Sequence, residues 1–409
     1  MSDTLLEGLA ARLARPVAES ERQRARLHLL DWLACVAGGR ECEAGLVGRA
    51  VSRIPWEQST YIGNAMEMDD IHRKGLLHPG PVVWPAAMSW PSADLNARLD
   101  AAVRGYEAMI AVGAALDAYH YAHWHPTTTA GFFGAAAAFG SLIGSNKAEY
   151  ENGLGNAGSV AGGFWHLRHD NTLAKQWHVY HVVRTGRDAM LHVHYGATGP
   201  KGLLEGPQGM FAGMTRQPGS LAEAADGGWL IGEVSFKPFA SCRHSHPTID
   251  AAMTLRERGE LHAPFTVETF ADAILFCDRP DPKTVIEAKF SLQHVLAVVA
   301  DGRKAEPADF TEKAIAELAD LRAQVSVAEA EEFTSRYPEH FGARVNGLAI
   351  YDTLGDPERP VSQAQLVEKF HMLAQWGGVS EASATRAVDL ALHGDDAEAI
   401  DALLEEWLA

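Results

Sequence analysis

Basic residues and cysteines are both scarce in this chain. Its 409 residues include 35 lysines and arginines against 53 aspartates and glutamates, a formal net charge of −18. Nucleic acid and anionic membrane surfaces are therefore not expected as partners, because both require a basic surface. The four cysteines, Cys35, Cys42, Cys242 and Cys277, form no CxxC pair. We expect reduced, mostly buried thiols in a cytoplasmic protein rather than a disulfide framework.

Signatures of several common protein classes are also missing. The amino terminus carries charges every few residues and resembles neither a signal peptide nor a membrane span. The absence of HExxH and GxSxG argues against a zinc protease helix and a nucleophile elbow. Gly153, Gly155 and Gly158 spell GxGxxG, but EYEN rather than a strand precedes them. We expect these glycines to serve helix packing rather than nucleotide binding.

Metal binding by histidines is a further possibility that the sequence does not favour. Three groups have suitable spacing: His120, His123 and His125; His166 and His169; and His178 and His181. No Cys/His knuckle or carboxylate-rich ligand set accompanies them. We therefore expect neither a metal nor an organic cofactor.

Periodicity predicts a mainly α-helical protein. Over residues 97–118 one apolar stripe recurs at helical spacing, formed by Leu99, Val103, Tyr106 and Ile110. The stretch 131–144 is nearly all small or apolar and predicts an interior helix. A last helix is indicated by the capping-box spacing of Asp395 and Glu398. Its buried face would consist of Ile400, Leu403, Leu404 and Trp407.

The length of the chain and a change of pattern predict two domains, since a single core rarely grows this large. Between residues 236 and 345 the runs TVETFADAILF and QVSVAEA are β-prone, around the helix-like stretch EPADFTEKAIAELADLRA. We therefore expect an all-helical body, residues 1–235 and 346–409, interrupted by a smaller α+β lid domain at 236–345.

Histidine is the residue type that stands out. Thirteen of the nineteen histidines lie between His72 and His246. Because imidazole titrates near neutral pH, a pocket lined by several histidines can both remove and deliver protons. The clustering therefore predicts proton-transfer chemistry.

Seven ordered segments carry a resemblance to a known family. They are LLDWLACVAGG from Leu29, GNAMEMDDIHRKGLLHPGPVVWPAA from Gly63, HYAHWHPTTTAGFFGAAAAFGSLIG from His120, LAKQWHVYHVVRTG from Leu173, TGPKGLLEGPQGMF from Thr198, KPFASCRHSHPTIDAA from Lys237, and CDRPDPKTVIEAKFSLQHVLAVVADGR from Cys277. In order and character they resemble the MmgE/PrpD family, which includes 2-methylcitrate dehydratase, cis-aconitate decarboxylase and iminodisuccinate epimerase. The likeness extends from about residue 25 to the carboxyl end.

The resemblance implies an active site in the cleft between a helical body and an α+β lid, in a homodimer. It also implies a small di- or tricarboxylate substrate that reacts at a carbon next to a carboxylate, without an organic cofactor. Removing a hydrogen α to a carboxylate requires a base, and cations or donors where negative charge accumulates.

The resemblance implies catalytic roles for five residues. Lys175 in AKQWH would act as base or as carboxylate clamp. His125 in WHPT matches a family histidine, and Tyr121 lies four residues earlier. His78 in HPGP and His246 in SHP resemble the other two active-site histidines, one in the body and one in the lid. Their meeting would require lid closure, which also expels water.

A second set of residues is expected to bind substrate or to orient the catalytic groups. These residues are Glu67, Asp69, Asp70, His72, His178, Arg184, Arg243 and His294. The acidic ones belong to EMDDIH, the counterpart of a DFDDTH-like family segment, and would orient the histidines and the lysine. Both arginines suit bidentate pairing with a carboxylate, and a structural salt bridge is the alternative for Arg184.

The sequence therefore predicts a cofactor-independent lyase, a dehydratase of a 2-methylcitrate-like polycarboxylate. One alternative is an epimerase of an iminodisuccinate-like diacid, with Tyr121 and Lys175 on opposite faces of one carbon. Another is a cis-aconitate-type decarboxylase, which is weakened because His294 stands where that branch has tyrosine. A non-catalytic paralogue is the alternative of a different class, and the retained lysine and histidines argue against it.

Overall fold

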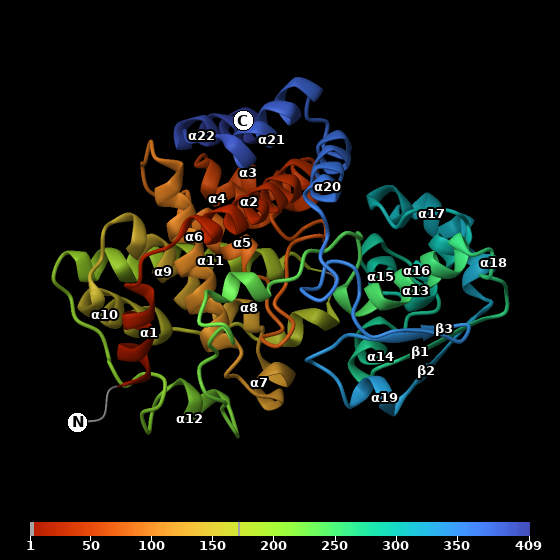
Figure 1. Ribbon diagram of the computed structural model, residues 1–409, viewed down its shortest axis with the longest axis horizontal. Helices are drawn as coiled ribbons and strands as arrows, with labels where there is room; N and C mark the ends of the chain where they lie inside the picture. The colour runs from red at the N-terminus through yellow and green to blue at the C-terminus, as the bar shows by residue number, and fades with distance from the viewer. Residues whose placement is uncertain (1–3, 171) are drawn as a thin grey trace. The chain divides into compact units, whose positions relative to one another are not determined.

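The computed structural model describes residues 4–170 and 172–409, which pack into two compact units (Figure 1). The first unit runs up to Ala65, from Asp69 to Val234, and from Gln363 to Ala409. The second contains Met66–Met68 and Ser235–Ser362. Helices dominate the described residues and one four-stranded sheet lies in the second unit, which confirms the predicted mainly α class.

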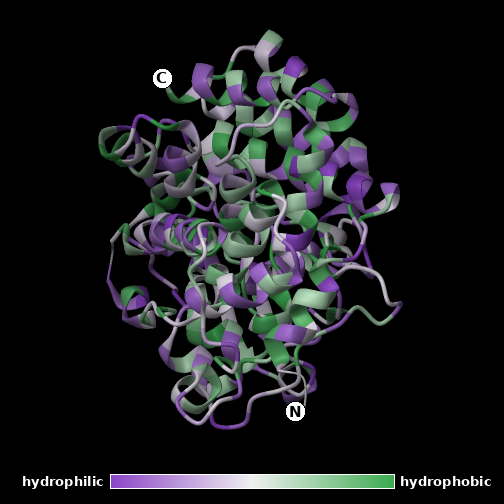
Figure 2. Ribbon diagram, turned by 90° about the vertical axis from the view of Figure 1, so that its left-hand side faces the viewer, coloured by the Kyte–Doolittle hydropathy of each residue, from purple (hydrophilic) through white to green (hydrophobic). Residues whose placement is uncertain are grey.

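The first unit is built from α-helices. They are α1 (Leu5–Leu13), α2 (Glu19–Gly39), α3 (Glu43–Val51), α4 (Pro55–Ile62), α5 (Gly80–Ala87), α6 (Leu95–Gly113), α7 (Ala118–His123), α8 (Pro126–Thr129), α9 (Gly131–Leu142), α10 (Lys147–Gly158), α11 (Ala174–His194), α12 (Met210–Met214), α20 (Gln363–Trp376), α21 (Glu381–His393) and α22 (Ala397–Leu408). Many of these ribbons carry both hydrophilic and hydrophobic residues, as amphipathic helices do (Figure 2).

Helix α9 lies at the centre of the first unit. It packs against α5, α6, α10 and α11, and its residues from Gly131 to Gly140 are all buried. Small residues allow this close approach: a Cβ at Gly134 would lie 2.8 Å from the Cβ of Met109 in α6. The predicted interior helix is therefore confirmed.

The glycines of the GxGxxG sequence lie in α10 and serve helix packing, as expected. A Cβ at Gly153 would lie 1.9 Å from Met190 Sδ of α11, and one at Gly158 would lie 2.3 Å from the Phe133 ring of α9. Larger side chains would separate α10 from these two neighbours.

Two expected helix boundaries were wrong by a few residues. Helix α6 buries its whole predicted stripe but ends at Gly113 rather than residue 118, because Asp117 already caps α7 by accepting a hydrogen bond from His120 N. Helix α22 begins after Asp396, which accepts from the backbone at residues 398 and 399, so the cap is not Asp395. The predicted apolar face of α22 is buried.

The carboxyl-terminal helices return to the first unit, where α20 and α21 pack against α2 and α22 packs against α4. A buried ion pair reinforces this contact, with Lys369 Nζ of α20 donating to Asp31 Oδ1 of α2 over 2.6 Å. Trp407 of α22 donates its indole hydrogen to Ser383 Oγ of α21 over 2.9 Å.

The second unit contains the sheet. Its helices are α13 (His246–Glu257), α14 (Ala271–Cys277), α15 (Val285–Lys289), α16 (Leu292–Ala300), α17 (Glu312–Glu317), α18 (Ala319–Arg322) and α19 (Glu331–Thr334), and its strands are β1 (Phe265–Thr269), β2 (Val325–Glu329), β3 (Ala343–Val345) and β4 (Leu348–Ile350). The strand order is β2-β1-β3-β4. Strands β1 and β2 are parallel, and β3 and β4 form a hairpin around Asn346 and Gly347, which both have positive φ.

Both β-prone runs of the sequence supply a strand, β1 from the first and β2 from the second. The second half of the first run does not continue the strand. It forms α14 instead, which packs against β2. Among the helices of the described chain, none combines the length and apolar character that crossing a bilayer requires.

Candidate active site

The loop between α4 and α5 is held in place by Asp70. This side chain is 2% exposed. One of its oxygens accepts from Gly80 N over 2.8 Å, and the other accepts from His28 Nδ1 over 2.8 Å and Tyr106 Oη over 2.5 Å. A Cβ at Gly80 would lie 2.7 Å from the Asp70 carboxylate, so a larger residue there would displace it. Burial lowers the pKa of His28 to about 4, so its ring is neutral near pH 7.

His78 lies in the same loop, and the protein engages its Nδ1 atom. This nitrogen is 2.8 Å from Asp69 Oδ2 and 3.1 Å from the carbonyl oxygen of Asp70. Since both neighbours are acceptors, Nδ1 carries the hydrogen and Nε2 has the available lone pair in the neutral ring. The backbone N–H of His78 donates to Thr127 Oγ1 over 3.0 Å, which fixes the loop against α8.

His125 immediately precedes α8 and lies in a group of three side chains. Its Nδ1 is 2.8 Å from Thr128 Oγ1 and 3.4 Å from His178 Nδ1 of α11. Thr128 Oγ1 is also 3.3 Å from His178 Nδ1. The Trp165 ring stacks on the His125 ring with centroids 4.5 Å apart and an interplanar angle of 8°. The imidazole of His125 is therefore held on one face and at one nitrogen.

Lys175 and His78 lie close enough to His125 for their charges to affect its pKa. Burial lowers the pKa of His125 well below its usual range, and the nearby charges of His178, Lys175 and His78 lower it further. Burial also lowers the pKa of His178. Near pH 7 both rings of the pair are consequently neutral. The structure thus places Lys175, His78, His125 and His178 in one region of the first unit, and their catalytic or orienting roles stay predictions.

Tyr121 and His72 occupy the edges of this region. Tyr121 is half-buried on α7, with its ring centroid 6.4 Å from that of Trp165. The buried His72 accepts from Gly75 N at Nδ1 over 3.1 Å, and its Nε2 lies 3.7 Å from Glu233 Oε2. His72 therefore stabilises the turn that lies between Asp70 and His78.

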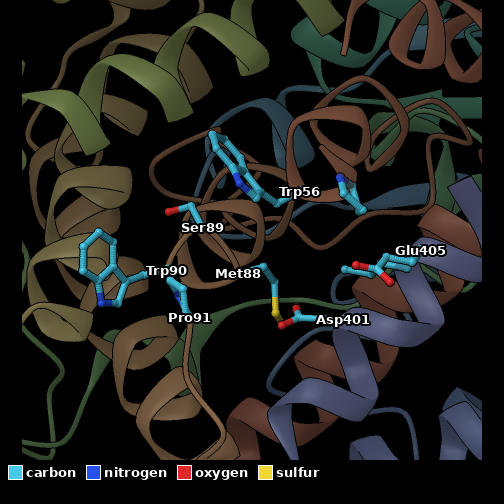
Figure 3. A pocket seen from close by; sticks show the side chains of 9 residues that line it. Trp56, Met88, Ser89, Trp90, Pro91, Asp401 and Glu405 are labelled. Carbon is cyan, nitrogen blue, oxygen red and sulfur yellow. The ribbon is translucent and has the colours of Figure 1, made fainter. Parts of the chain in front are cut away.

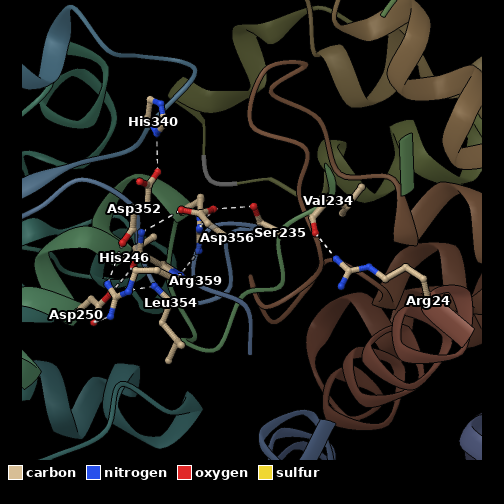
Figure 4. Close-up of polar contacts among 12 residues, drawn as sticks. Arg24, Val234, Ser235, His246, Asp250, His340, Asp352, Leu354, Asp356 and Arg359 are labelled. Atoms are coloured by element: carbon tan, nitrogen blue, oxygen red, sulfur yellow. Dashed lines mark hydrogen bonds and ion pairs between the residues drawn. The ribbon is translucent and has the colours of Figure 1, made fainter. Parts of the chain in front are cut away.

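His246, which is labelled in Figure 4, and Arg243 both belong to the second unit, where their side chains contact each other. Arg243 forms a buried ion pair with Asp356, and its Nη1 is 3.3 Å from His246 Nδ1. Because a guanidinium can only donate, His246 accepts at Nδ1, and its Nε2 donates to the Ser241 carbonyl over 3.2 Å. Both ring nitrogens are thus occupied within the second unit, so the catalytic role of His246 stays a prediction.

Glu67 also belongs to the second unit. Its backbone has a φ of 56°, a conformation that costs a non-glycine residue roughly 1–3 kcal/mol. Its carboxylate lies 3.6 Å from Lys237 Nζ, and Lys237 is fully buried without a hydrogen-bond partner among the described residues. Lys289 donates to the carbonyl of Met66 over 3.0 Å. The buried ammonium of Lys237 can pair with an anion. No sequence motif identified this lysine.

The remaining predicted residues have structural contacts. In the second unit, His294 Nε2 donates to the Asp309 carbonyl over 2.8 Å, and burial lowers the pKa of His294 to about 4. Arg184 is half exposed, and its Nη1 donates to Tyr180 Oη over 2.7 Å. These contacts favour a surface interaction as the role of Arg184.

Among the described residues, none of the three histidine groups with suitable spacing forms a cluster that could hold a metal ion. His120 Nε2 bonds Thr129, His123 Nδ1 bonds the Tyr119 carbonyl, and His125 Nδ1 bonds Thr128. In the second unit, three other side chains have ligand atoms within 4.8 Å of one another: His340, Asp352 and Glu358. His340 and Asp352 already pair over 2.6 Å (Figure 4).

A pocket of about 260 Å³ lies elsewhere in the first unit (Figure 3). It is lined by Pro55, Trp56, Met88, Ser89, Trp90, Pro91, Asp401, Leu404 and Glu405. None of these residues was predicted to be catalytic, and Asp401 is already paired with Arg98. The pocket therefore contains none of the predicted site residues.

Comparison with known proteins gives two matches to domain families and two similar proteins. Residues 59–220 match the MmgE/PrpD N-terminal domain, and residues 239–393 match the MmgE/PrpD C-terminal domain. The chain is 27% identical over 269 residues to cis-aconitate decarboxylase of Homo sapiens, covering 60% of this chain and 55% of that protein. It is 24% identical over 287 residues to cis-aconitate decarboxylase-like protein oryM of Aspergillus oryzae, covering 57% of each. The chain thus spans little more than half the length of these relatives.

Proposed function

The chain belongs to the MmgE/PrpD family, and from this premise we propose that it is a lyase that removes a proton α to a carboxylate of a small di- or tricarboxylate. It would do so as a cytoplasmic homodimer without an organic cofactor. The finer proposal is dehydration of a 2-methylcitrate-like acid.

One observation carries the proposal: His78 and His125 are bonded to the protein through Nδ1 and make no hydrogen bond at Nε2 among the described residues. Each ring is thus oriented by its neighbours and keeps one nitrogen for a ligand. Two such imidazoles in one region, together with the charge of Lys175, suit a reaction that takes one proton and gives another.

In the proposed dehydration, His78 Nε2 takes the α-hydrogen as a proton, and the electron pair of the broken C–H bond forms the carbon–carbon double bond. The hydroxyl leaves as water after receiving a proton from His125. The products are an olefin and water. Lys175 would offset the negative charge that gathers on the carboxylate oxygens while the carbon loses its proton.

Decarboxylation of a cis-aconitate-like acid is the second candidate, and the names of both relatives favour it. That reaction releases carbon dioxide from the substrate and needs a proton delivered to carbon, so one acid is enough. The pair of oriented imidazoles is the feature that favours dehydration instead.

Product analysis separates these reactions. The full chain is incubated with 2-methylcitrate, citrate, cis-aconitate and iminodisuccinate, and the products are followed by proton NMR together with carbon dioxide release. We expect olefin and water from a hydroxy acid, and loss of turnover in Lys175→Ala. Arg184→Ala is the matched control and should retain turnover. Carbon dioxide release alone would establish the decarboxylase, racemisation alone the epimerase, and no reaction with any acid would contradict the proposal.

A further inference from the structure

Thr128 bridges two histidines by a single hydroxyl. Its Oγ1 is 2.8 Å from His125 Nδ1 and 3.3 Å from His178 Nδ1. A hydroxyl has one hydrogen and can also accept. It can therefore donate to one ring while accepting from the other, and the chain of three groups has two possible polarities.

The surroundings make a stable positive charge on His125 unfavourable. The ring is 1% exposed, and the cations or rings that face it are His178, Lys175, His78 and His120. The ring of His178 is half-buried and faces His181. A proton that reaches His125 Nε2 is consequently better passed on than held, and His178 is the more exposed of the two rings.

We propose that the Thr128 hydroxyl relays a proton between His125 and the more exposed His178. This inference rests on the proposed function and deepens it by giving His125 a route to solvent. In one polarity His125 Nδ1 donates to Thr128 and Thr128 donates to His178 Nδ1, so His125 Nε2 is a base. In the other, His178 Nδ1 donates to Thr128 and Thr128 donates to His125 Nδ1, so His125 Nε2 carries a hydrogen.

Each passage between the two polarities conserves protons. His125 Nε2 gains a proton, His125 Nδ1 gives its own to Thr128 Oγ1, and Thr128 gives its original proton to His178 Nδ1. His178 then releases its Nε2 proton to water. All three groups end neutral with a hydrogen on His125 Nε2, and the reverse passage takes place as His125 donates that proton to a leaving hydroxyl. Thr128 and His178 are positioning residues in this scheme, since neither has to touch the substrate.

Substitution at Thr128 tests the relay during turnover. Thr128→Val keeps the shape and removes the hydroxyl, and Thr128→Ser restores the hydroxyl. With 2-methylcitrate in D₂O, we measure deuterium gained by recovered substrate per olefin formed. We expect this ratio to rise at least about tenfold in Thr128→Val and to return in Thr128→Ser, because His78 can still exchange the α-hydrogen with solvent, whereas His125 can no longer receive a proton at Nδ1 while it donates one to the leaving hydroxyl. A merely structural role would slow turnover and leave the ratio unchanged, which would overturn the proposal.

A second measurement needs no turnover and separates failure of the relay from failure of the proposed function. In the full chain labelled with ¹⁵N-histidine, nitrogen spectra of wild type and both variants are compared, with His125→Asn and His178→Asn for assignment. We expect Thr128→Val to shift the Nδ1 signals of both rings and Thr128→Ser to shift neither. If Thr128→Val leaves either ring unchanged, the relay is wrong even in an active enzyme. If both shift but no acid reacts, the proposed function fails while the hydrogen-bonded chain stands.

Discussion

Replacing Asp70 by asparagine should destabilise the first unit. The carboxylate is buried and accepts three hydrogen bonds, from Gly80 N, His28 Nδ1 and Tyr106 Oη. An amide can keep the first bond through its oxygen but presents an NH₂ group to the other two donors. Hydrogen bonds to a charged partner contribute about 1.5–3 kcal/mol each, so losing two gives a decrease of about 3–6 kcal/mol in the free energy of unfolding.

Urea unfolding followed by tryptophan fluorescence measures this decrease selectively. All ten tryptophans lie in the sequence of the first unit, so the signal reports on that unit. Asp94→Asn is the matched control, because this exposed cap of α6 accepts from Asn96 N and asparagine caps equally well. We expect the control to remain within about 0.5 kcal/mol of the wild type.

A double-mutant cycle with Tyr106→Phe gives the contribution of the phenol. We expect a coupling free energy of about 1 kcal/mol or more between Asp70→Asn and Tyr106→Phe, since the two side chains share one hydrogen bond. A single Asp70→Asn variant as stable as the control would refute the assignment of Asp70 as the anchor of this loop.

Two further predictions concern the same region. Asp69→Asn should lower kcat by about 10²–10⁴-fold and leave urea unfolding unchanged. The reason is that an amide facing His78 Nδ1 can donate to this nitrogen, so that the ring hydrogen moves to Nε2. A variant with wild-type kcat would contradict this prediction. The first unit should lose stability as the pH falls from 6.5 towards 4, because unfolding exposes His28, whose folded pKa of about 4 lies below the usual histidine pKa of 6.5. This amounts to at most about 3 kcal/mol. Asp31 acts in the opposite direction because burial raises its pKa to about 7. The test is therefore the difference in the free energy of unfolding between wild type and His28→Asn across this pH range. Parallel pH profiles of the two proteins would exclude the role of His28.

Local sequence patterns were sufficient for the fold class and for several helices. The run of alanines and glycines predicted α9 because small, apolar residues have few other uses in such density. Motifs predicted His78, His125 and Lys175 as site residues, and all three lie in one region of the first unit, while their catalytic roles stay predictions. Thr128 stands in the same motif as His125, three residues later. This spacing could have predicted the contact between the two side chains.

Long-range contacts could not be read from the sequence. Asp70 contacts His28 and Tyr106, which are 42 and 36 residues away along the chain, and no local pattern records such a distance. Three residues, Met66–Met68, belong to the second unit although the helical body continues on both sides of them. The burial of Lys237 is likewise invisible in the sequence, where a lysine is normally solvated.

We propose that this chain forms a carbanion next to a carboxylate with His78, His125 and Lys175. Deuterium incorporation from D₂O into 2-methylcitrate, at the carbon that bears the methyl group, measures this step. We predict incorporation by the wild type, and none above background by Lys175→Ala that unfolds like the wild type. A Lys175→Ala variant that exchanges this hydrogen at the wild-type rate would contradict the claim.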